Sequence, residues 1–334
     1  MENDMTQLAA LDFELPSRNV RPLRTRLRAV LLGCGTVNSG VLDGLAEMSG
    51  AVEVSAVVTR RPRPGKDGRT AWLTDIRDAF DTGPDLVIDG LPDCPAAEKA
   101  LELAVERGIH VVSANKAVIA RRPDLEVRAR RKGTRFVYSA AVGGGVPVLE
   151  TVIRLTSAGE RIARVRGVLN GTSNFVLGLL EQGTGFDEAI AAAQAAGFAE
   201  ADPSADIDGL DAAAKLALIA RKAFAFAPDA ASIPAQSLLS LDPGQVCGAR
   251  ENGLRYRQLA ELTRLEDGTI DARVSLTALP EDHPLARPEN EENTVEIVCE
   301  SGLKVVLHGK GAGRSPTAGA VLADIRDLVE AGEV

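Results

Sequence analysis

The sequence predicts an α/β fold, in which a doubly wound parallel sheet is combined with a second, mixed α+β domain. Short apolar strands alternate with helical segments over roughly the first 140 residues, as a parallel sheet with crossover helices requires. The first clear strand ends in Gly33-Cys34-Gly35 and runs straight into a helix, which is the beginning of a βαβ unit. Beyond that region the strands are separated by longer excursions.

The individual elements follow from hydrophobic periodicity. The apolar run at 27–32, LRAVLL, is typical of a buried strand. A helix is expected over 37–48, because Val37, Val41 and Leu45 fall on one helical face. Further strands are expected at 52–58, 85–89 and 110–113, and a second helix at 96–107.

The second half begins with a break in the chain. Three consecutive glycines at 143–145 interrupt the pattern, and Pro147 begins a helix-like run. The remaining pattern predicts strands at 164–169, 272–276, 294–298 and 303–307, and helices at roughly 185–196, 209–224 and 254–262. Residues 1–26 are interpreted as a flexible or loosely docked N-terminal extension.

Composition limits the classes of function. The chain has 334 residues, 45% apolar and 25% charged, which suits a globular protein of two domains. A formal net charge of −9 argues against binding to nucleic acid or to anionic membrane. One basic cluster is interpreted as a solvated helix face, and it comprises Arg121, Arg122, Arg128, Arg130, Arg131 and Lys132.

The cysteines and the apolar runs bear on the compartment. Cys34, Cys94, Cys247 and Cys299 lie far apart without a CxxC motif, so neither a zinc site nor a disulfide framework is indicated. No run reaches the ~18 apolar residues of a membrane span, and the N-terminus lacks the apolar core of a signal peptide. We therefore expect a cytoplasmic protein with a small-molecule partner.

The glycine-rich turn predicts a dinucleotide site. Gly33 permits the tight turn, and Gly35 lets the backbone approach a pyrophosphate, while the helix that begins at Thr36 and Val37 offers free N–H groups. Asn38 stands where a third glycine is usual, so we expect it to push the helix outward or lean into the cleft and to weaken cofactor binding. The alternative is an ordinary glycine-rich turn between a strand and a helix.

The end of the second strand favours NADP over NAD. An NAD enzyme places an acidic residue there to bind the ribose hydroxyl groups, whereas this chain has Thr59-Arg60-Arg61. Arg60 and Arg61 could pair with a 2′-phosphate, and the alternative is that both arginines are merely solvated. NAD remains the alternative cofactor.

Three polar segments are candidates for the chemistry. Ser113-Ala114-Asn115-Lys116 follows a strand, so Lys116 should face the cleft beyond the carboxyl ends of the sheet, unless it is a surface lysine. Gly171 and Thr172 lie in a polar turn after another strand, and there the alternative is a plain helix cap.

The third segment, residues 197–215, gives the strongest signal. Five carboxylates fall within twelve residues and lead into a helix, on which Asp211 and Lys215 are four residues apart and share a face. A lysine among apolar residues can act as a proton donor, and nearby carboxylates can hold a substrate ammonium group. A surface ion pair is the alternative, but it needs no further acids upstream.

With these motifs in view, the chain resembles the homoserine dehydrogenase family along nearly its whole length after residue 27. The motifs that carry the resemblance are SANKAVIA (113–120), AVGGGVPVLET (141–151), GVLNGTSNFVLG (167–178), GFAEADPSADIDGLDAAAKLALIA (197–220), DHPLA (282–286) and GKGAGRSPTAGAVLAD (309–324).

The resemblance implies a domain organisation. Residues 27–140 would form a Rossmann-type dinucleotide-binding domain that is completed by 308–334. Residues 141–307 would bind substrate, carry the catalytic groups and form the interface of a homodimer. The chain ends soon after the family's C-terminal helix, so we expect a short form without the regulatory domain of some members.

The resemblance also implies residue roles. Lys215 would protonate the reacting carbonyl oxygen and Lys116 would be a second lysine near the substrate. The substrate would be bound by Glu200, Asp206, Asp211, Gly171 and Thr172, and the cofactor by Gly33, Gly35, Thr36, Val37, Arg60, Arg61, Ser113, Lys116 and Gly313. A monovalent cation such as Na⁺ or K⁺ would bind the backbone oxygens of Val142 and Gly144, although Ser139 stands where many members have a glutamate.

The reaction implied is NAD(P)-dependent interconversion of L-aspartate 4-semialdehyde and L-homoserine. Two alternatives remain open. The chain could be a paralogue that reduces a related amino-acid aldehyde in a specialised pathway, since one changed pocket contact can switch a substrate. It could also be a non-catalytic binding protein on the same scaffold, although Lys116, Glu200, Asp211 and Lys215 are retained.

Overall fold

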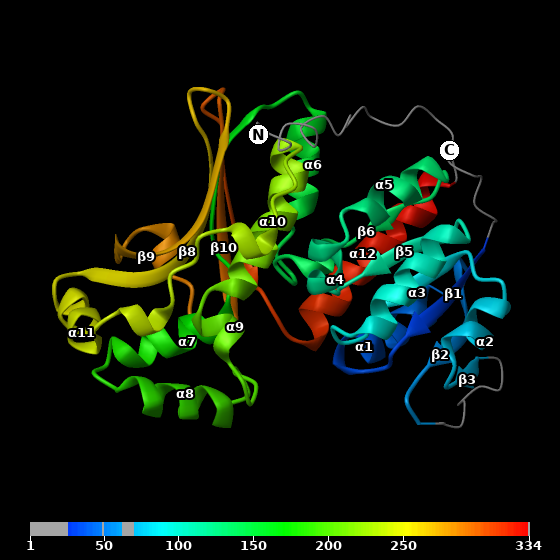
Figure 1. The fold of residues 1–334 in the computed structure, drawn as a ribbon, viewed down its shortest axis with the longest axis horizontal. Coiled ribbons are helices and arrows are strands. Elements are labelled where there is room, and N and C mark those ends of the chain that lie inside the picture. The colour runs from blue at the N-terminus through cyan, green and yellow to red at the C-terminus, as the bar shows by residue number, and fades with distance from the viewer. Residues whose placement is uncertain (1–25, 49, 62–69, 333–334) are drawn as a thin grey trace, which may run out of the picture.

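The computed structural model describes residues 26–48, 50–61 and 70–332. The predicted N-terminal extension lies outside these residues except for Arg26. Two sheets organise the chain, one on each side of a central group of helices (Figure 1). The predicted fold class is therefore confirmed.

The first sheet is parallel, with the strand order β3-β2-β1-β4-β5-β6. Its strands are β1 (Leu27–Leu32), β2 (Val52–Val58), β3 (Ala71–Leu73), β4 (Leu86–Asp89), β5 (His110–Ser113) and β6 (Phe136–Val137). The helices of this half are α1 (Thr36–Glu47), α2 (Ile76–Asp81), α3 (Pro95–Glu106), α4 (Lys116–Arg121) and α5 (Asp124–Arg131). Strand order reverses at β1 and β4, so their carboxyl ends flank the crevice in which such folds bind ligands.

The last helix, α12 (Arg314–Ala331), returns to the first sheet and packs on α1. The close approach depends on two glycines of α1, because a Cβ at Gly40 would lie 2.9 Å from that of Ala318 and one at Gly44 would lie 2.3 Å from Leu322. Leu322 and its neighbours on α12 share a core with Leu31 of β1. Helices from both the N-terminal and the C-terminal part of the chain therefore pack on the first sheet.

The second sheet is antiparallel, with the strand order β11-β10-β7-β8-β9. Its strands are β7 (Ile162–Val168), β8 (Leu254–Arg264), β9 (Ile270–Pro280), β10 (Glu292–Cys299) and β11 (Lys304–Lys310). The helices of this half are α6 (Val148–Ser157), α7 (Gly171–Leu180), α8 (Phe186–Ala195), α9 (Ser204–Ile207), α10 (Leu210–Phe224) and α11 (Pro243–Glu251). Side chains of α6 and α10 share one continuous core with this sheet and with the α3 and α5 side of the first sheet. The two halves are therefore joined by packed apolar side chains.

The predicted helix at 254–262 is wrong, because these residues form most of β8. Leu259 and Leu262 have helical spacing, but Leu254, Tyr256, Ala260 and Leu262 also fit the two-residue period of a strand. Tertiary pairing decided between the two patterns. Strand β8 lies between β7 and β9, and a turn at Leu265–Gly268 connects it to β9 as a hairpin.

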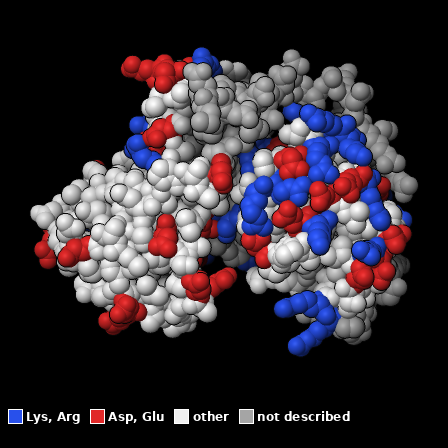
Figure 2. Space-filling model, viewed as in Figure 1, with Lys and Arg blue, Asp and Glu red and all other residues white. Residues whose placement is uncertain are grey.

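The predicted basic cluster lies on α4 and α5, where acidic side chains of α3 and of the preceding loop face it. Arg122 contacts Glu98, Glu102 and Asp124, and Arg128 contacts Glu102, Glu106 and Asp124. Figure 2 shows the two signs interspersed over this part of the surface. The cluster is thus a charge-balanced helix surface. Among the described residues, no helix has the length and apolar character needed to cross a membrane.

Asn38 occupies a different place from the one expected of it. Its side chain is buried, and Nδ2 donates to the carbonyl oxygens of Leu32 and Gly33 at 3.0 and 2.9 Å. Gly90 makes room for it, since a Cβ there would lie 2.6 Å from Asn38 Cγ. The expectation that Asn38 pushes α1 outward or leans into the cleft is therefore wrong. The side chain is short enough to fold back and bind the end of β1 to α1.

We expect Asn38→Gly to lower the free energy of unfolding by about 2 kcal/mol, because two carbonyl oxygens lose a buried donor. Urea denaturation would measure this. Ala46→Gly is the matched control, since Ala46 lies exposed on the same helix and its replacement costs only the ~1 kcal/mol of helix propensity. An equal loss in both variants would contradict this role of Asn38.

Candidate active site

A large cavity lies where the carboxyl ends of the first sheet face the second half of the chain. Its volume is about 1490 Å³. Loops after β4 and β5 contribute one side of the lining, and the start of α7, the residues around α9 and α10, and the segment from β11 to α12 contribute the rest. The three polar segments predicted from the sequence therefore meet in one place.

Asp211 is at the centre of this site. Lys116 Nζ and Lys215 Nζ each lie 2.7 Å from one of its two carboxylate oxygens. Asp211 and Lys215 are on α10, whereas Lys116 is the first residue of α4 and reaches across from the half that contains the first sheet. Lys215 also donates to the carbonyl oxygen of Leu169 at 2.6 Å. The Asp211 side chain is 6% exposed and that of Lys116 is 42% exposed, so the pair extends from the interior to the open cavity.

The charges of this group are fixed by their mutual contacts. Burial alone would raise the pKa of Asp211, but Lys215 and Lys116 outweigh it and hold the pKa well below its usual value. Burial likewise would lower the pKa of Lys116, and the carboxylates of Asp211, Asp206 and Glu200 outweigh it and raise the pKa. Asp211 therefore stays a carboxylate and Lys116 an ammonium group at neutral pH.

Asn170 and Thr172 connect the start of α7 to the acidic loop. Asn170 Nδ2 donates to Asp206 at 2.6 Å and to Asp211 at 2.8 Å, while its Oδ1 accepts from the backbone N–H of Ser173 and so caps α7. Thr172 Oγ1 contacts Asp206 Oδ2 at 3.1 Å. Gly171 allows a close approach to the loop before β10, because a Cβ there would lie 3.0 Å from the carbonyl oxygen of Asn290.

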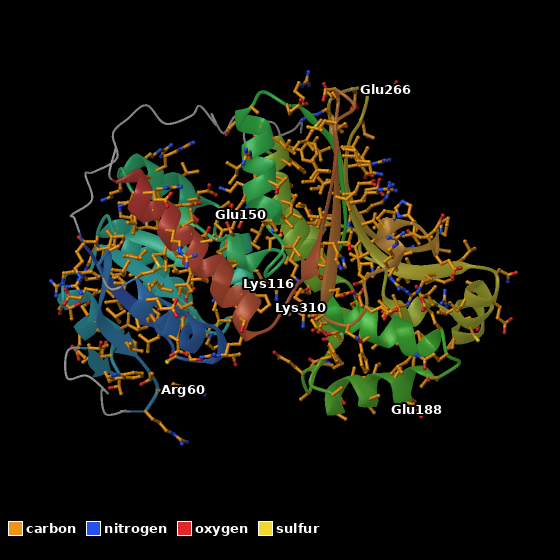
Figure 3. The ribbon with its side chains drawn as sticks, turned by 180° about the vertical axis from the view of Figure 1, so that it is seen from behind. Arg60, Lys116, Glu150, Glu188, Glu266 and Lys310 are labelled. Carbon is orange, nitrogen blue, oxygen red and sulfur yellow. The ribbon has the colours of Figure 1, made fainter. Side chains whose placement is uncertain are left out.

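The sequence analysis missed several residues of the same cavity. Asn170, Glu291, Lys310 and Arg314 all line it. Lys310 Nζ lies 2.8 Å from Glu291 Oε1, and Figure 3 shows Lys310 close to Lys116 where the two halves of the chain meet. Three of the four stood inside the family motifs, but nothing in their spacing revealed which way their side chains point. Glu200 and Gly313 also line this cavity, and their roles in binding substrate and cofactor stay predictions.

A second cavity of about 1030 Å³ lies beside the predicted dinucleotide turn. Gly33, Gly35, Arg60 and Arg61 line it. A Cβ at Gly35 would meet no atom within 4 Å, so a ligand has room to approach the backbone there. Helix α1 begins at Thr36 and Val37 without a side-chain cap, which leaves its first N–H groups available to a phosphate. These residues fit a dinucleotide. Arg60 extends outward at the rim (Figure 3).

Ser113, which was predicted to bind the cofactor, lies beneath the two cavities and lines neither of them. It is fully buried, and its Oγ donates to Asp89 at 2.8 Å and accepts from the backbone N–H of Asn115 at 3.1 Å. The other oxygen of Asp89 accepts from the backbone N–H of Leu91. Burial raises the pKa of Asp89 to about 6, against the lowering effect of these hydrogen bonds. Asp89 thus supports the loops that carry Leu91 and Lys116.

The segment predicted to hold a monovalent cation is a tight, buried turn. Gly143 and Gly144 have positive φ angles of 83° and 57°, and a Cβ at Gly144 would lie 2.4 Å from the carbonyl oxygen of Gly311. No group of three or more His, Cys, Asp or Glu side chains that could hold a metal is present in the part of the chain that the structure describes. An ion bound by the carbonyl oxygens of Val142 and Gly144 stays a prediction.

Comparison with known proteins agrees with this arrangement. The family profile for homoserine dehydrogenase matches residues 147–326, and that for the homoserine dehydrogenase NAD-binding domain matches residues 33–139. The homoserine dehydrogenase of Synechocystis is 35% identical over 315 residues, which cover 90% of this chain and 72% of the relative. The chain belongs to the homoserine dehydrogenase family.

Two further homoserine dehydrogenases extend the comparison. The NAD(+)-dependent homoserine dehydrogenase of Pseudomonas canavaninivorans is 38% identical over 251 residues, covering 75% of this chain and 69% of that protein. The crystal structure of the Thiobacillus denitrificans homoserine dehydrogenase superposes with a TM-score of 0.84 at 31% identity, covering 91% of this chain and 73% of that one. The family consists of oxidoreductases that act on CH–OH groups. Residues 33–139 of this chain match the NAD-binding domain of that family.

The raised pKa of Asp89 predicts a pH dependence of stability. The usual pKa of 3.8 applies to the unfolded chain, and about 6 applies to the folded one. The folded state therefore holds the proton more tightly, so its contribution is complete below about pH 4 and is lost as pH rises through 6. The parent loses this stabilisation as pH rises, whereas Asp89→Asn cannot. We therefore expect the difference in unfolding free energy, variant minus parent, to increase by about 2–3 kcal/mol as pH rises from about 4 to 7. Urea denaturation at several pH values would measure it, and a difference that does not vary with pH would contradict it.

Proposed function

We propose that this protein interconverts L-aspartate 4-semialdehyde and L-homoserine with NADP as the preferred cofactor. The observation that supports the proposal most strongly is the buried carboxylate of Asp211 between Lys116 and Lys215, at the edge of a cavity next to a dinucleotide turn. A carbonyl that accepts a hydride needs positive charge and a proton donor at its oxygen, and this arrangement offers both. The ammonium group of an amino-acid substrate needs carboxylates, which Glu200 and Asp206 offer in the same cavity.

The position of each side chain in the cavity supports its proposed role in the reaction. NADPH, when bound, supplies the hydride to the aldehyde carbon. Lys215 donates a proton to the carbonyl oxygen, and Lys116 stabilises the negative charge that develops there. Asp211 keeps both ammonium groups in position. Gly171 and Thr172 line the cavity at the start of α7, where backbone N–H groups have no partner within the helix and can donate to the substrate.

The preference for NADP rests on the residues at the end of β2. Arg60 and Arg61 are exposed at the rim of the cofactor cavity, where a 2′-phosphate would find two positive charges. Among the relatives, that of Pseudomonas canavaninivorans is NAD(+)-dependent, so membership of the family does not fix the cofactor. A guanidinium group pairs with phosphate by charge-assisted hydrogen bonds, which favours NADP in this chain.

We also propose that the chain forms a homodimer through the face of the second sheet that α6 and α10 leave open. On that face Glu261 pairs with Arg273, and the buried Glu296 pairs with Arg166 at 2.5 Å. Charges that are already neutralised by neighbours cost less to cover than isolated ones.

The proposed functional domains are those expected from the sequence, with residues 308–334 completing the dinucleotide-binding domain.

The direct test is the loss of 340 nm absorbance on mixing the protein, NADPH and L-aspartate 4-semialdehyde. Turnover with this aldehyde supports the proposal. Turnover only with another amino-acid aldehyde would identify a paralogue with a changed substrate. Binding of NADPH without turnover of any such aldehyde would identify a non-catalytic protein.

Lys215→Ala should lower kcat by ~10²–10⁴-fold with the fold intact, because the reacting oxygen loses its proton donor. Steady-state kinetics and circular dichroism would measure both. Lys222→Ala is the matched control, since Lys222 lies on the same helix and pairs with Glu126 away from the cavity. Near-normal turnover in the folded Lys215 variant would contradict the assignment.

Arg60→Ala should weaken NADPH binding by roughly 1.5–3 kcal/mol and leave NADH binding almost unchanged. The reason is that only NADPH carries a 2′-phosphate, which loses its guanidinium partner in this variant. Fluorescence titration with both cofactors at one salt concentration would measure it. Arg107→Ala, which removes an exposed charge paired with Asp81, controls for net charge. Equal affinity of the parent protein for NADPH and NADH would show that Arg60 and Arg61 are only solvated.

A further inference from the structure

Lys116 depends on a helix that is too short to hold its own position. Helix α4 has six residues, and isolated helices of that length are not stable in water. Its first turn is secured locally, because the side chain of Asn115 accepts from the backbone N–H of Val118. Its last carbonyl groups have no such support. Pro123 stands four residues after Ile119 and has no N–H to donate to the Ile119 carbonyl oxygen.

A buried arginine from the other half of the chain supplies the missing donors. Arg221 lies on α10 and is 3% exposed. Its Nη1 donates to the carbonyl oxygen of Ile119 at 2.7 Å, and its Nη2 donates to that of Ala120 at 2.5 Å. A guanidinium group is suited to this, because its two terminal nitrogens can bind two adjacent carbonyl oxygens while its positive charge faces the negative end of the helix dipole.

Helix α10 therefore contacts α4 at both of its ends. Asp211 binds Lys116 at the first residue of α4, and Arg221, ten residues further along α10, binds the last turn. Ten helical residues span about 15 Å, which is enough to reach along α4. Arg221 itself does not line the active-site cavity. Arg221 also interacts with Tyr138, but its hydrogen bonds to Ile119 and Ala120 are the ones that reach the helix carrying Lys116.

We propose that Arg221 is a positioning residue for Lys116. It fixes the register of α4 against α10, so that the Lys116 ammonium group stays on Asp211 and over the substrate cavity. The proposal rests on the proposed function, in which Lys116 stabilises the charge on the reacting oxygen. It adds a residue from outside the cavity whose contribution to turnover passes through a single lysine.

A merely structural role would leave a different signature. Arg257 offers the comparison, because it is as deeply buried at 1% exposure. It donates to Glu181 and to the carbonyl oxygen of Tyr256, and neither Arg257 nor Glu181 lines the active-site cavity. Loss of either arginine removes buried hydrogen bonds and lowers stability. Only loss of Arg221 should release α4. The effect of that loss on kcat should therefore depend on whether Lys116 is present, whereas the effect of losing Arg257 should not.

The experiment is a double-mutant cycle with the full chain. Arg221→Met, Lys116→Ala and the double variant are compared with Arg257→Met in both backgrounds, by kcat and by NADPH titration. We expect Arg221→Met to lower kcat at least tenfold while the Kd for NADPH changes less than threefold. In the Lys116→Ala background the same substitution should change kcat less than twofold, whereas any effect of Arg257→Met should be equal in both backgrounds.

Hydrogen exchange gives a readout that does not need turnover. The amide of Arg122, which donates to the carbonyl oxygen of Val118, should exchange at least tenfold faster in Arg221→Met, while the amides of α10 keep their protection. If Arg221→Met fails to fold, Arg221→Lys serves in its place, since one ammonium group can bind only part of the carbonyl pair and should give an intermediate kcat.

The possible results distinguish the role of Arg221 from that of Lys116. Unchanged kcat and unchanged exchange in the Arg221 variants, or an equal loss of kcat with and without Lys116, would overturn the positioning role and leave the proposed function standing. Unchanged kcat in Lys116→Ala would instead show that Lys116 has no role in the reaction, which contradicts the proposed function at that residue.

Discussion

The ion pair group around Asp211 is the constraint on which the rest of the site depends. A carboxylate that is 6% exposed is costly unless positive charge and hydrogen bonds surround it. Lys116, Lys215 and Asn170 meet that need, and they come from α4, α10 and the start of α7. Three helices from two halves of the chain must therefore converge on one buried carboxylate. The same contacts raise the pKa of Lys116 and keep it charged beside the open cavity.

The packing between the halves makes that convergence rigid. One apolar core runs from the α3 and α5 side of the first sheet through α6 and α10 to the second sheet. The buried Arg221 adds polar contacts across the same junction, and α12 returns from β11 to pack on α1. Each reactive group is thus held by elements that are themselves packed, which is the condition for fixed geometry at a reaction centre.

The two cavities differ in charge in a way that suits different ligands. The cavity around Asp211 is lined by Glu200, Asp202 and Asp206 as well, together with the lysines Lys116, Lys215 and Lys310, which favours a small molecule with an ammonium group and a developing negative charge. The cofactor cavity has Arg60 and Arg61 at its rim and the uncapped start of α1 at its base, which favours phosphate. Asn38 and Asp89 act beneath that base, where they bind β1 to α1 and support the loops after β4 and β5.

The sequence by itself determined the parallel sheet, the dinucleotide turn and the acidic segment ending in Lys215, because each depends on local period or local spacing. It did not distinguish strand from helix at 254–262, where both periods fit and only pairing with β7 and β9 decides. Nor did it show that Asn38 supports β1, since the carbonyl groups it binds are defined only once α1 packs on the sheet. The sequence did not predict the positions of Lys310, Arg314 and Arg221 for the same reason. Their partners lie up to 275 residues away in the chain, and only the folded backbone brings those atoms within hydrogen-bonding distance.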